Sequence, residues 1–171
     1  MPWELTLLKY DGVPPRFRRD ADAQRELPLG TLHEVRNHIS NALPGTAWYE
    51  ELPLIEMMKA NGSESWKTWD KEMIESASMP KLKAVYNAGG VCFEMFGFSQ
   101  VGPLKHVLME IRGNENPIPA LRSLCDPKNW SVVEEGTEPE FIRLDGEAID
   151  RWNKWQKYLN VAIQQSQLDN S

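Results

Sequence analysis

The first apolar segment of the chain, residues 3–10, alternates in polarity. Trp3, Leu5 and Leu7 fall on one side of an extended chain, and the residues between them fall on the other. This two-residue period predicts a half-buried β-strand. The next stretch, residues 11–28, is rich in charges and contains adjacent prolines, which predicts a loop with little regular structure.

A period of three to four residues replaces the alternation in residues 31–43 and predicts an amphipathic helix. Thr31 and Glu34 have the spacing of a capping box at its start, and Pro44-Gly45 ends it. We expect the apolar stripe of this helix to pack on a sheet. Its members are Leu32, Val35, Ile39, Ala42 and Leu43.

The second half of the chain predicts a hairpin, a helix and further strands. Residues 89–99 are almost continuously apolar, which favours a central strand covered on both faces. Residues 104–113 alternate and follow after a short turn, so the two strands should form a hairpin. A helix is predicted over 116–125, and shorter strands over 129–136 and 139–145.

Two segments rich in tryptophan remain. Residues 49–87 predict a helical insertion, and residues 146–166 a long C-terminal amphipathic helix. Tryptophan is common both in cores and at interface hot spots, so these side chains either pack internally or bind a partner. They are Trp66 and Trp69 in the insertion and Trp152 and Trp155 in the last helix. For the first pair we expect packing against the C-terminal helix or its symmetry mate.

The elements follow one another in the order β-α-β-β-α-β within a single domain of residues 1–171. This is the order of a ferredoxin-like split βαβ core, so we predict an α+β fold of that kind, with the insertion and the C-terminal helix added. The two crossing helices would cover one face of the sheet. The insertion or the C-terminal helix would cover the other, because the strand at 89–99 is apolar on both sides.

The composition is that of an ordinary globular protein, with 41% hydrophobic and 26% charged residues. The formal charge of −6 disfavours nucleic acid and anionic membranes as partners. The sequence has no signal-peptide pattern and no apolar run of about 20 residues, so we expect a cytoplasmic protein without a membrane span. Cys92 and Cys125 are too few for a disulfide framework, and we expect two buried free thiols.

The usual motifs for metals, cofactors and nucleophiles are missing from the sequence. His33 and His38 are five residues apart, which separates them by about 140° around a helix, so they cannot hold one metal ion together. There is no CxxC, no phosphate-binding glycine loop and no GxSxG. We therefore predict no cofactor, no metal site and no catalytic residue of these classes.

Short motifs spread along the chain resemble those of a group of small uncharacterised bacterial proteins. They are Leu29-Gly30-Thr31, Glu34-Val35, Ile39, Leu43-Pro44-Gly45, Trp48, Phe93-Glu94-Met95, Gly97, Arg112-Gly113, Trp130, Phe141 and Leu144-Asp145. The function of that group is unknown, so the resemblance implies no activity. The chain departs from the group at Glu110, where a histidine is frequent, and at Asn114, where a glycine is usual.

Glu94, Glu110 and Arg112 are the candidate polar site. If they share one sheet face, they form either a ligand clamp or acid/base pair, or a cross-strand ion pair, which we favour. The strand-to-helix loop after Arg112 could bind an anion through free N–H groups. Glu115 would repel an anion, so we interpret the loop as a connection and expect Arg112 to pair with Glu94 or Glu134.

Three hypotheses on function follow. The first is a protein-interaction module of the immunity, adaptor or regulatory type, which binds a protein partner or forms a homodimer. The second is a small-molecule-binding regulator that uses the sheet face or a cleft beside the insertion. The third is an enzyme that uses Glu94, Glu110 and Arg112, ranked last because no nucleophile, metal set or cofactor loop is present. An exposed apolar patch favours the first, and a deep polar pocket the others.

Overall fold

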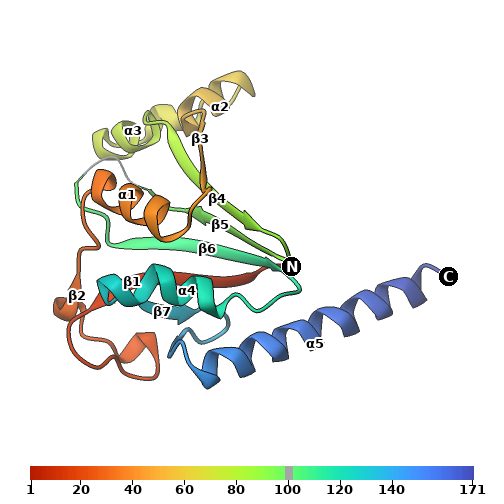
Figure 1. The fold of residues 1–171 in the computed structure, drawn as a ribbon. Helices are drawn as coiled ribbons and strands as arrows, with labels where there is room; N and C mark the ends of the chain where they lie inside the picture. The colour runs from red at the N-terminus through yellow and green to blue at the C-terminus, as the bar shows by residue number, and fades with distance from the viewer. Residues whose placement is uncertain (99–101) are drawn as a thin grey trace.

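One antiparallel sheet forms the centre of the fold, in a computed structural model that describes residues 1–98 and 102–171 (Figure 1). Its strands lie in the order β3-β4-β5-β6-β1-β7-β8, and β2 pairs with β1 beside this path. The strands are β1 (Trp3–Tyr10), β2 (Glu26–Leu27), β3 (Ala47–Glu51), β4 (Lys81–Ala88), β5 (Val91–Phe96), β6 (His106–Gly113), β7 (Ser131–Glu134) and β8 (Glu140–Ile142).

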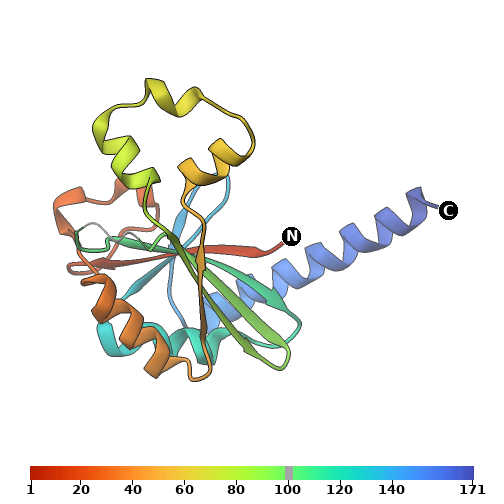
Figure 2. The ribbon, with the colours of Figure 1, turned by 90° about the horizontal axis from the view of Figure 1, so that it is seen from above.

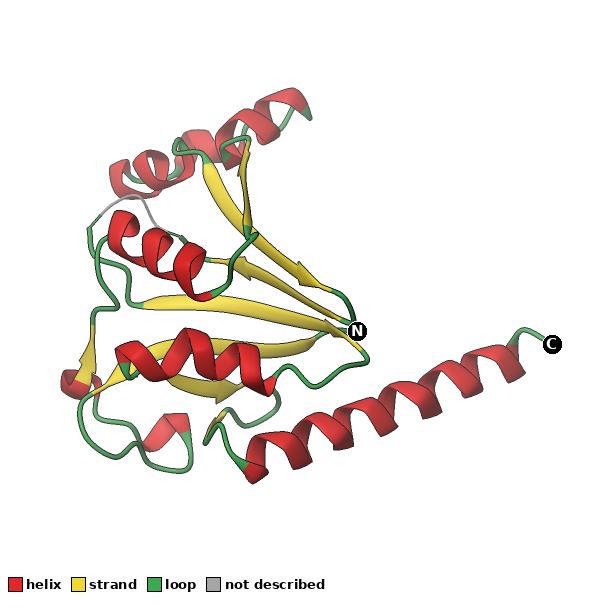
Figure 3. Ribbon diagram, viewed as in Figure 1, coloured by secondary structure: helices red, strands yellow, loops and turns green. Residues whose placement is uncertain are grey.

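Helices α1 and α4 lie side by side on one face of this sheet, which we call the front face (Figures 1 and 3). The opposite face is the back face. Figure 2 shows the segment with α2 and α3 behind the sheet, and α5 extending away on another side. The helices are α1 (Leu32–Ala42), α2 (Leu54–Ala60), α3 (Lys71–Ala77), α4 (Ile118–Cys125) and α5 (Gly146–Asp169).

The main core lies between the front face and these two helices. Val35 and Ile39 of α1 are buried in the same cluster as Phe93, Met109 and Ile111 of the strands. The predicted stripe and its position on the sheet are therefore confirmed. The capping box is also present, because the Thr31 side chain accepts the backbone N–H of Glu34 and that glutamate reaches back to Thr31.

The coarse fold class is confirmed and the finer one is not. The protein combines helices with an antiparallel sheet, as an α+β fold does. The sheet has eight strands, however, and this does not establish the ferredoxin-like arrangement. The range 49–87 was expected to be helical. It holds α2 and α3, but it begins in β3 and ends in β4, which widen the sheet.

Cover of the back face differs from the prediction. The loop after β1 covers one end, where Leu8, Tyr10, Val133 and Phe141 form a second cluster with Ala21. Neither α5 nor the insertion covers the middle of this face (Figures 1 and 2). The strand at 89–99 was expected to be buried on both faces. In β5 only alternate residues are buried, since the others point to this open side.

Only the first half of α5 packs on the domain. Ala148 and Trp152 join the main core, and the Gln156 side chain donates to the backbone oxygen of Gly113 at 3.0 Å. Every residue from 160 onward is exposed, and the helix projects from the body there (Figure 1). Within the described part of the chain, no helix combines the length and the apolarity needed to cross a bilayer.

Cys92 and Cys125 are both free, which confirms that they are not bonded to each other. Cys125 is buried, and burial raises the pKa of its thiol far above the usual value. Cys92 is only half-buried on the back face, so the prediction of two buried thiols was wrong for this residue. Its pKa is raised by burial and by the charge of Glu94.

Candidate functional site

Glu94, Glu110 and Arg112 come together on the back face. The hairpin register places Glu94 directly opposite Glu110. The guanidinium of Arg112 donates to Glu94 at 3.2 Å and to Glu110 at 3.1 Å. This confirms both the predicted convergence and the pairing of Arg112 with Glu94.

These three residues belong to a longer row of charges across the sheet. Glu110 also faces Glu4 on β1, and Lys83 of β4 lies 3.7 Å from Glu94. Like charges that face each other across strands are destabilising. Arg112, which contacts both Glu94 and Glu110, and Lys83, which lies beside Glu94, offset this repulsion. Within residues 1–98 and 102–171, Glu4 forms no ion pair.

Apolar side chains lie beside the charged row. Leu108 on β6 is 49% exposed, although β6 lies between β5 and β1 in the middle of the sheet. Its cross-strand neighbours are Phe96 and Thr6. The exposed part of the back face, which we call the open face, therefore combines apolar and charged groups. Its members are Glu4, Tyr49, Lys83, Val85, Cys92, Glu94, Phe96, Leu108, Glu110 and Arg112.

The loop from Arg112 to α4 has the features of a connection. The Asn116 side chain accepts the N–H of Ile118 at 3.0 Å, which satisfies one of the free donors at the start of the helix. Pro117 has no N–H to offer. The side chain of Arg112 is engaged on the open face rather than at this helix start.

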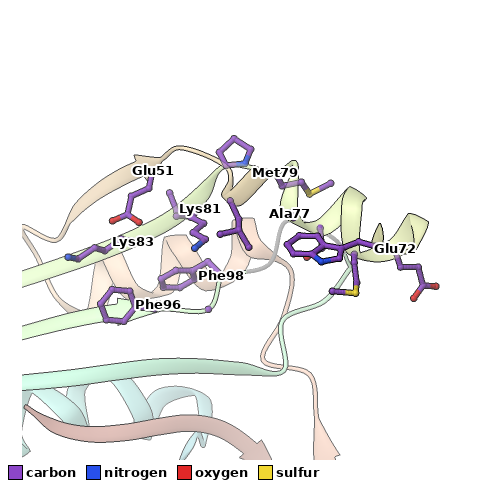
Figure 4. A pocket seen from close by; sticks show the side chains of 15 residues that line it. Glu51, Glu72, Ala77, Met79, Lys81, Lys83, Phe96 and Phe98 are labelled. Atoms are coloured by element: carbon purple, nitrogen blue, oxygen red, sulfur yellow. The ribbon is translucent and has the colours of Figure 1, made fainter. Parts of the chain in front are cut away.

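A pocket of about 870 Å³ lies where the open face meets the segment that carries α2 and α3. Figure 4 shows Lys81, Phe96 and Phe98 on the sheet side and Glu72 on the helical side. The lining is mainly apolar and aromatic, with charged residues among it. Sequence reasoning anticipated a cleft beside the insertion but did not find its lysines, which the alternation of residues 81–84 could have indicated.

The four tryptophans lie in different environments. Trp152 is 3% exposed and contacts Trp3, with ring centroids 5.5 Å apart, so it belongs to the core and not to a surface. Trp155 is half-buried beside Tyr158. The other two lie in the insertion, away from α5 of the same chain (Figures 1 and 2).

The contacts of Trp66 and Trp69 contradict the expected packing on the C-terminal helix of the same chain. Trp66 is flanked by the ammonium groups of Lys59 and Lys67, at 5.0 and 6.0 Å from its ring. Trp69 lines the pocket beside β4 and β5. The insertion leaves the sheet between β3 and β4, at the opposite edge from β8 and α5, so the two segments do not meet.

Sequence reasoning missed one polar network, centred on Arg151 of α5. Its guanidinium donates to Glu134 at 2.7 Å and to Glu140 at 2.5 Å, and Trp3 donates to the same Glu134 at 2.7 Å. The hydrogen bond from Arg151 lowers the pKa of Glu140. The four-residue spacing of Glu147 and Arg151 was the only local signal, because the other partners are distant in sequence. This network fastens α5 to β7 and β8.

The described residues hold no cluster of three or more histidine, cysteine or acidic side chains that could bind a metal ion. His38 instead contacts the backbone oxygen of Leu124 at 2.6 Å and the edge of Trp130. Cys92 is the thiol of the open face, and burial together with the charge of Glu94 raises its pKa, which disfavours the reactive thiolate. This arrangement is suited to binding through charged and apolar contacts.

No protein-family model matches the sequence, and no curated protein matches it significantly.

Proposed function

We propose that this protein is a protein-interaction module and that the open face is its docking surface. The observation that carries the proposal is the exposure of Leu108, which is 49% exposed in a central strand. Central strands normally have one face on the core and the other on water or a covering element. A large apolar residue in the middle of the uncovered face favours a partner that covers it.

The surroundings of Leu108 support this role. Protein interfaces have an apolar centre that excludes water and a polar rim. Here Phe96 and Leu108 are adjacent apolar residues, and the row of Glu94, Glu110 and Arg112 runs beside them. Glu94, Glu110 and Arg112 already have ionic partners, so a docking protein does not need to neutralise each of these three.

A basic protein surface is the partner that fits best. The charged row holds Glu4, Glu94 and Glu110 against Lys83 and Arg112, which leaves one negative charge (−3 + 2). The whole chain carries −6. Opposite net charges accelerate encounter and set orientation. This chemistry suits a cytoplasmic module of the immunity, adaptor or regulatory type.

We also propose that the eight-stranded sheet contains a ferredoxin-like core. Strands β5, β6, β1 and β7 are consecutive neighbours, with α1 between β1 and β5 in the chain and α4 between β6 and β7. This agrees with the β-α-β-β-α-β order, with β3, β4 and β8 as additions. The resemblance to small bacterial proteins covers mostly this part of the chain, and membership of that group remains a proposal.

Binding of a small molecule is the second candidate function, and the pocket beside the insertion favours it. Trp69, Met73 and Phe98 give it an apolar lining, and Lys81 and Lys83 lie at the same site. An apolar anion such as 8-anilinonaphthalene-1-sulfonate tests this function. Binding to the native protein that is lost in Met73→Glu would support it, and unchanged fluorescence of the dye would exclude it for ligands of this type.

Photocrosslinking tests the docking proposal. A photoreactive phenylalanine analogue replaces Leu108, in cells that produce the protein, and a control carries the analogue at the exposed Asn41 of α1. We expect one discrete protein adduct at position 108 that the control does not form. Mass spectrometry identifies the partner protein in the adduct. This partner is then purified and should bind the unmodified chain. An adduct that forms equally at both positions, or no adduct at 108, would overturn the proposal.

A further inference from the structure

The last three turns of α5 have an unusual surface. Residues 158–168 carry no charged side chain, although this part of the helix projects into solvent (Figure 1). Tyr158, Val161 and Leu168 are 52%, 60% and 74% exposed. A helix segment of this length is marginal in water without packing or charge pairs to support it. The surface therefore favours a covering partner.

Four residues of this segment form one stripe. Tyr158, Val161, Gln165 and Leu168 are separated by three, four and three positions, so they lie within about 80° of one another around the helix. Trp152, which packs on the body, lies on the opposite side. Tyr158, at the start of the stripe, lines a pocket beside the domain together with Trp3 and Trp155. Val161, Gln165 and Leu168 lie beyond the part of α5 that contacts its own domain.

We propose that a second copy of this chain binds this stripe, with the two α5 helices antiparallel. The four positions of the stripe are symmetric about position 163, because Tyr158 and Leu168 are each five residues from it and Val161 and Gln165 are each two residues from it. A two-fold axis at that level therefore places Tyr158 of one helix beside Leu168 of the other, and Val161 beside Gln165. Such a self-complementary surface is what a two-fold dimer requires.

Charge supports the same arrangement. The uncharged segment is bounded by Lys157 at one end and Asp169 at the other, and these positions are also symmetric about 163. Antiparallel pairing brings Lys157 of each helix to Asp169 of the other, whereas parallel pairing brings lysine to lysine. Two chains of charge −6 repel each other, and an uncharged segment is where they approach with least repulsion.

The dimer is weak by this argument. An overlap from 157 to 169 is about 18 Å long at a rise of about 1.5 Å per residue. Two helices in contact over that length bury less than the roughly 800 Å² per partner of a standard interface. We expect a dissociation constant in the micromolar range, and hence a mass that depends on concentration. The stripe and the open face are on different elements, so this inference does not depend on the proposed function.

Sedimentation equilibrium between about 1 and 200 μM tests the inference, because this range spans micromolar dissociation constants. The expected mass rises from that of one 19.6 kDa chain toward that of two. Val161→Asp should weaken association at least tenfold, since it places a charge in the stripe. Its matched control, Asn160→Asp, adds the same charge on a different side of the helix and should leave association unchanged.

A charge reversal tests the antiparallel register. Lys157→Glu should weaken the dimer, and the double variant Lys157→Glu/Asp169→Lys should restore it. Far-ultraviolet circular dichroism checks that each variant keeps its helix content. A monomer across the whole concentration range would overturn the proposal, as would a dimer insensitive to Val161→Asp. Failure of the double variant to restore association would overturn the antiparallel arrangement.

Discussion

Two neighbouring residues on β6 allow a direct measure of how open the back face is. Leu108 points to the open face and is 49% exposed, whereas Met109 points to the core and is 1% exposed. Replacement by alanine removes three heavy atoms from either side chain. The two variants therefore share their strand and the size of the deletion, and they differ in burial.

The magnitudes follow from that difference. Burial of three carbon-sized groups is worth about 2.4 kcal/mol at about 0.8 kcal/mol each. Met109→Ala loses this whole amount and leaves a cavity, so we expect a cost of about 2–5 kcal/mol. Leu108→Ala loses roughly half of the transfer free energy and leaves no enclosed cavity, so we expect about 1 kcal/mol.

Urea unfolding of the two variants and the wild type gives their free energies of unfolding. Equal m-values for the three proteins show that these free energies can be compared. The reasoning predicts that Met109→Ala is the more destabilised by about 2 kcal/mol. Equal losses in the two variants would refute it, because Leu108 would then be as well covered in solution as Met109.

Three further predictions concern the core, the thiols and the acid stability. Ile39→Ala should lower the free energy of unfolding by about 2–5 kcal/mol in urea melts, since Ile39 of α1 is fully buried in the core against the sheet; a loss under about 1 kcal/mol would place that helix elsewhere. Ellman's reagent should modify Cys92 slowly in the native protein and Cys125 only after unfolding, because Cys125 is buried; rapid modification of both would contradict this accessibility. Arg151 holds the pKa of Glu140 below its ordinary value of 4.5. The interaction of the Glu140 carboxylate with Arg151 therefore stabilises the fold completely above that pH. This stabilisation is lost as the pH falls through the lower pKa of the folded protein. Glu140→Gln should therefore be less stable than the wild type at neutral pH, and the difference should shrink on acidification in thermal melts; a difference that stays constant down to pH 2 would contradict the assignment.

Local patterns predicted much of the fold. The capped stripe of residues 31–43 specifies one helix and its buried side, and both are present. The alternation of residues 3–10 specifies a strand, which is present, but the prediction that it is half-buried was wrong, because Thr6, Leu8 and Tyr10 on its other face are buried as well. Strand β4 was missed although Leu82 and Ala84 alternate with lysines, because the helical periods before it dominated the interpretation of the whole segment. Its partner β3 has only five residues, and pairing across the 29 residues between Glu51 and Lys81 leaves no local signal.

The candidate site was predictable only in part. Glu94, Glu110 and Arg112 could be brought together from the hairpin register alone, since a two-residue period fixes their face. That this face is open could not be foreseen, because it depends on where the insertion and α5 lie. The contacts of Arg151 with Glu134 and Glu140 depend in the same way on the docking of α5.

The most direct test of the central claim is the affinity of the crosslinked partner for two matched variants. Leu108→Lys places a positive charge in the middle of the open face, and Asn41→Lys places the same charge on the exposed side of α1. Loss of a central anchor costs at least about 2 kcal/mol, which is about 30-fold in affinity. Isothermal titration calorimetry should therefore show at least that loss for Leu108→Lys and unchanged binding for Asn41→Lys. Equal affinities for wild type and Leu108→Lys, with the variant folded, would contradict the proposed docking surface.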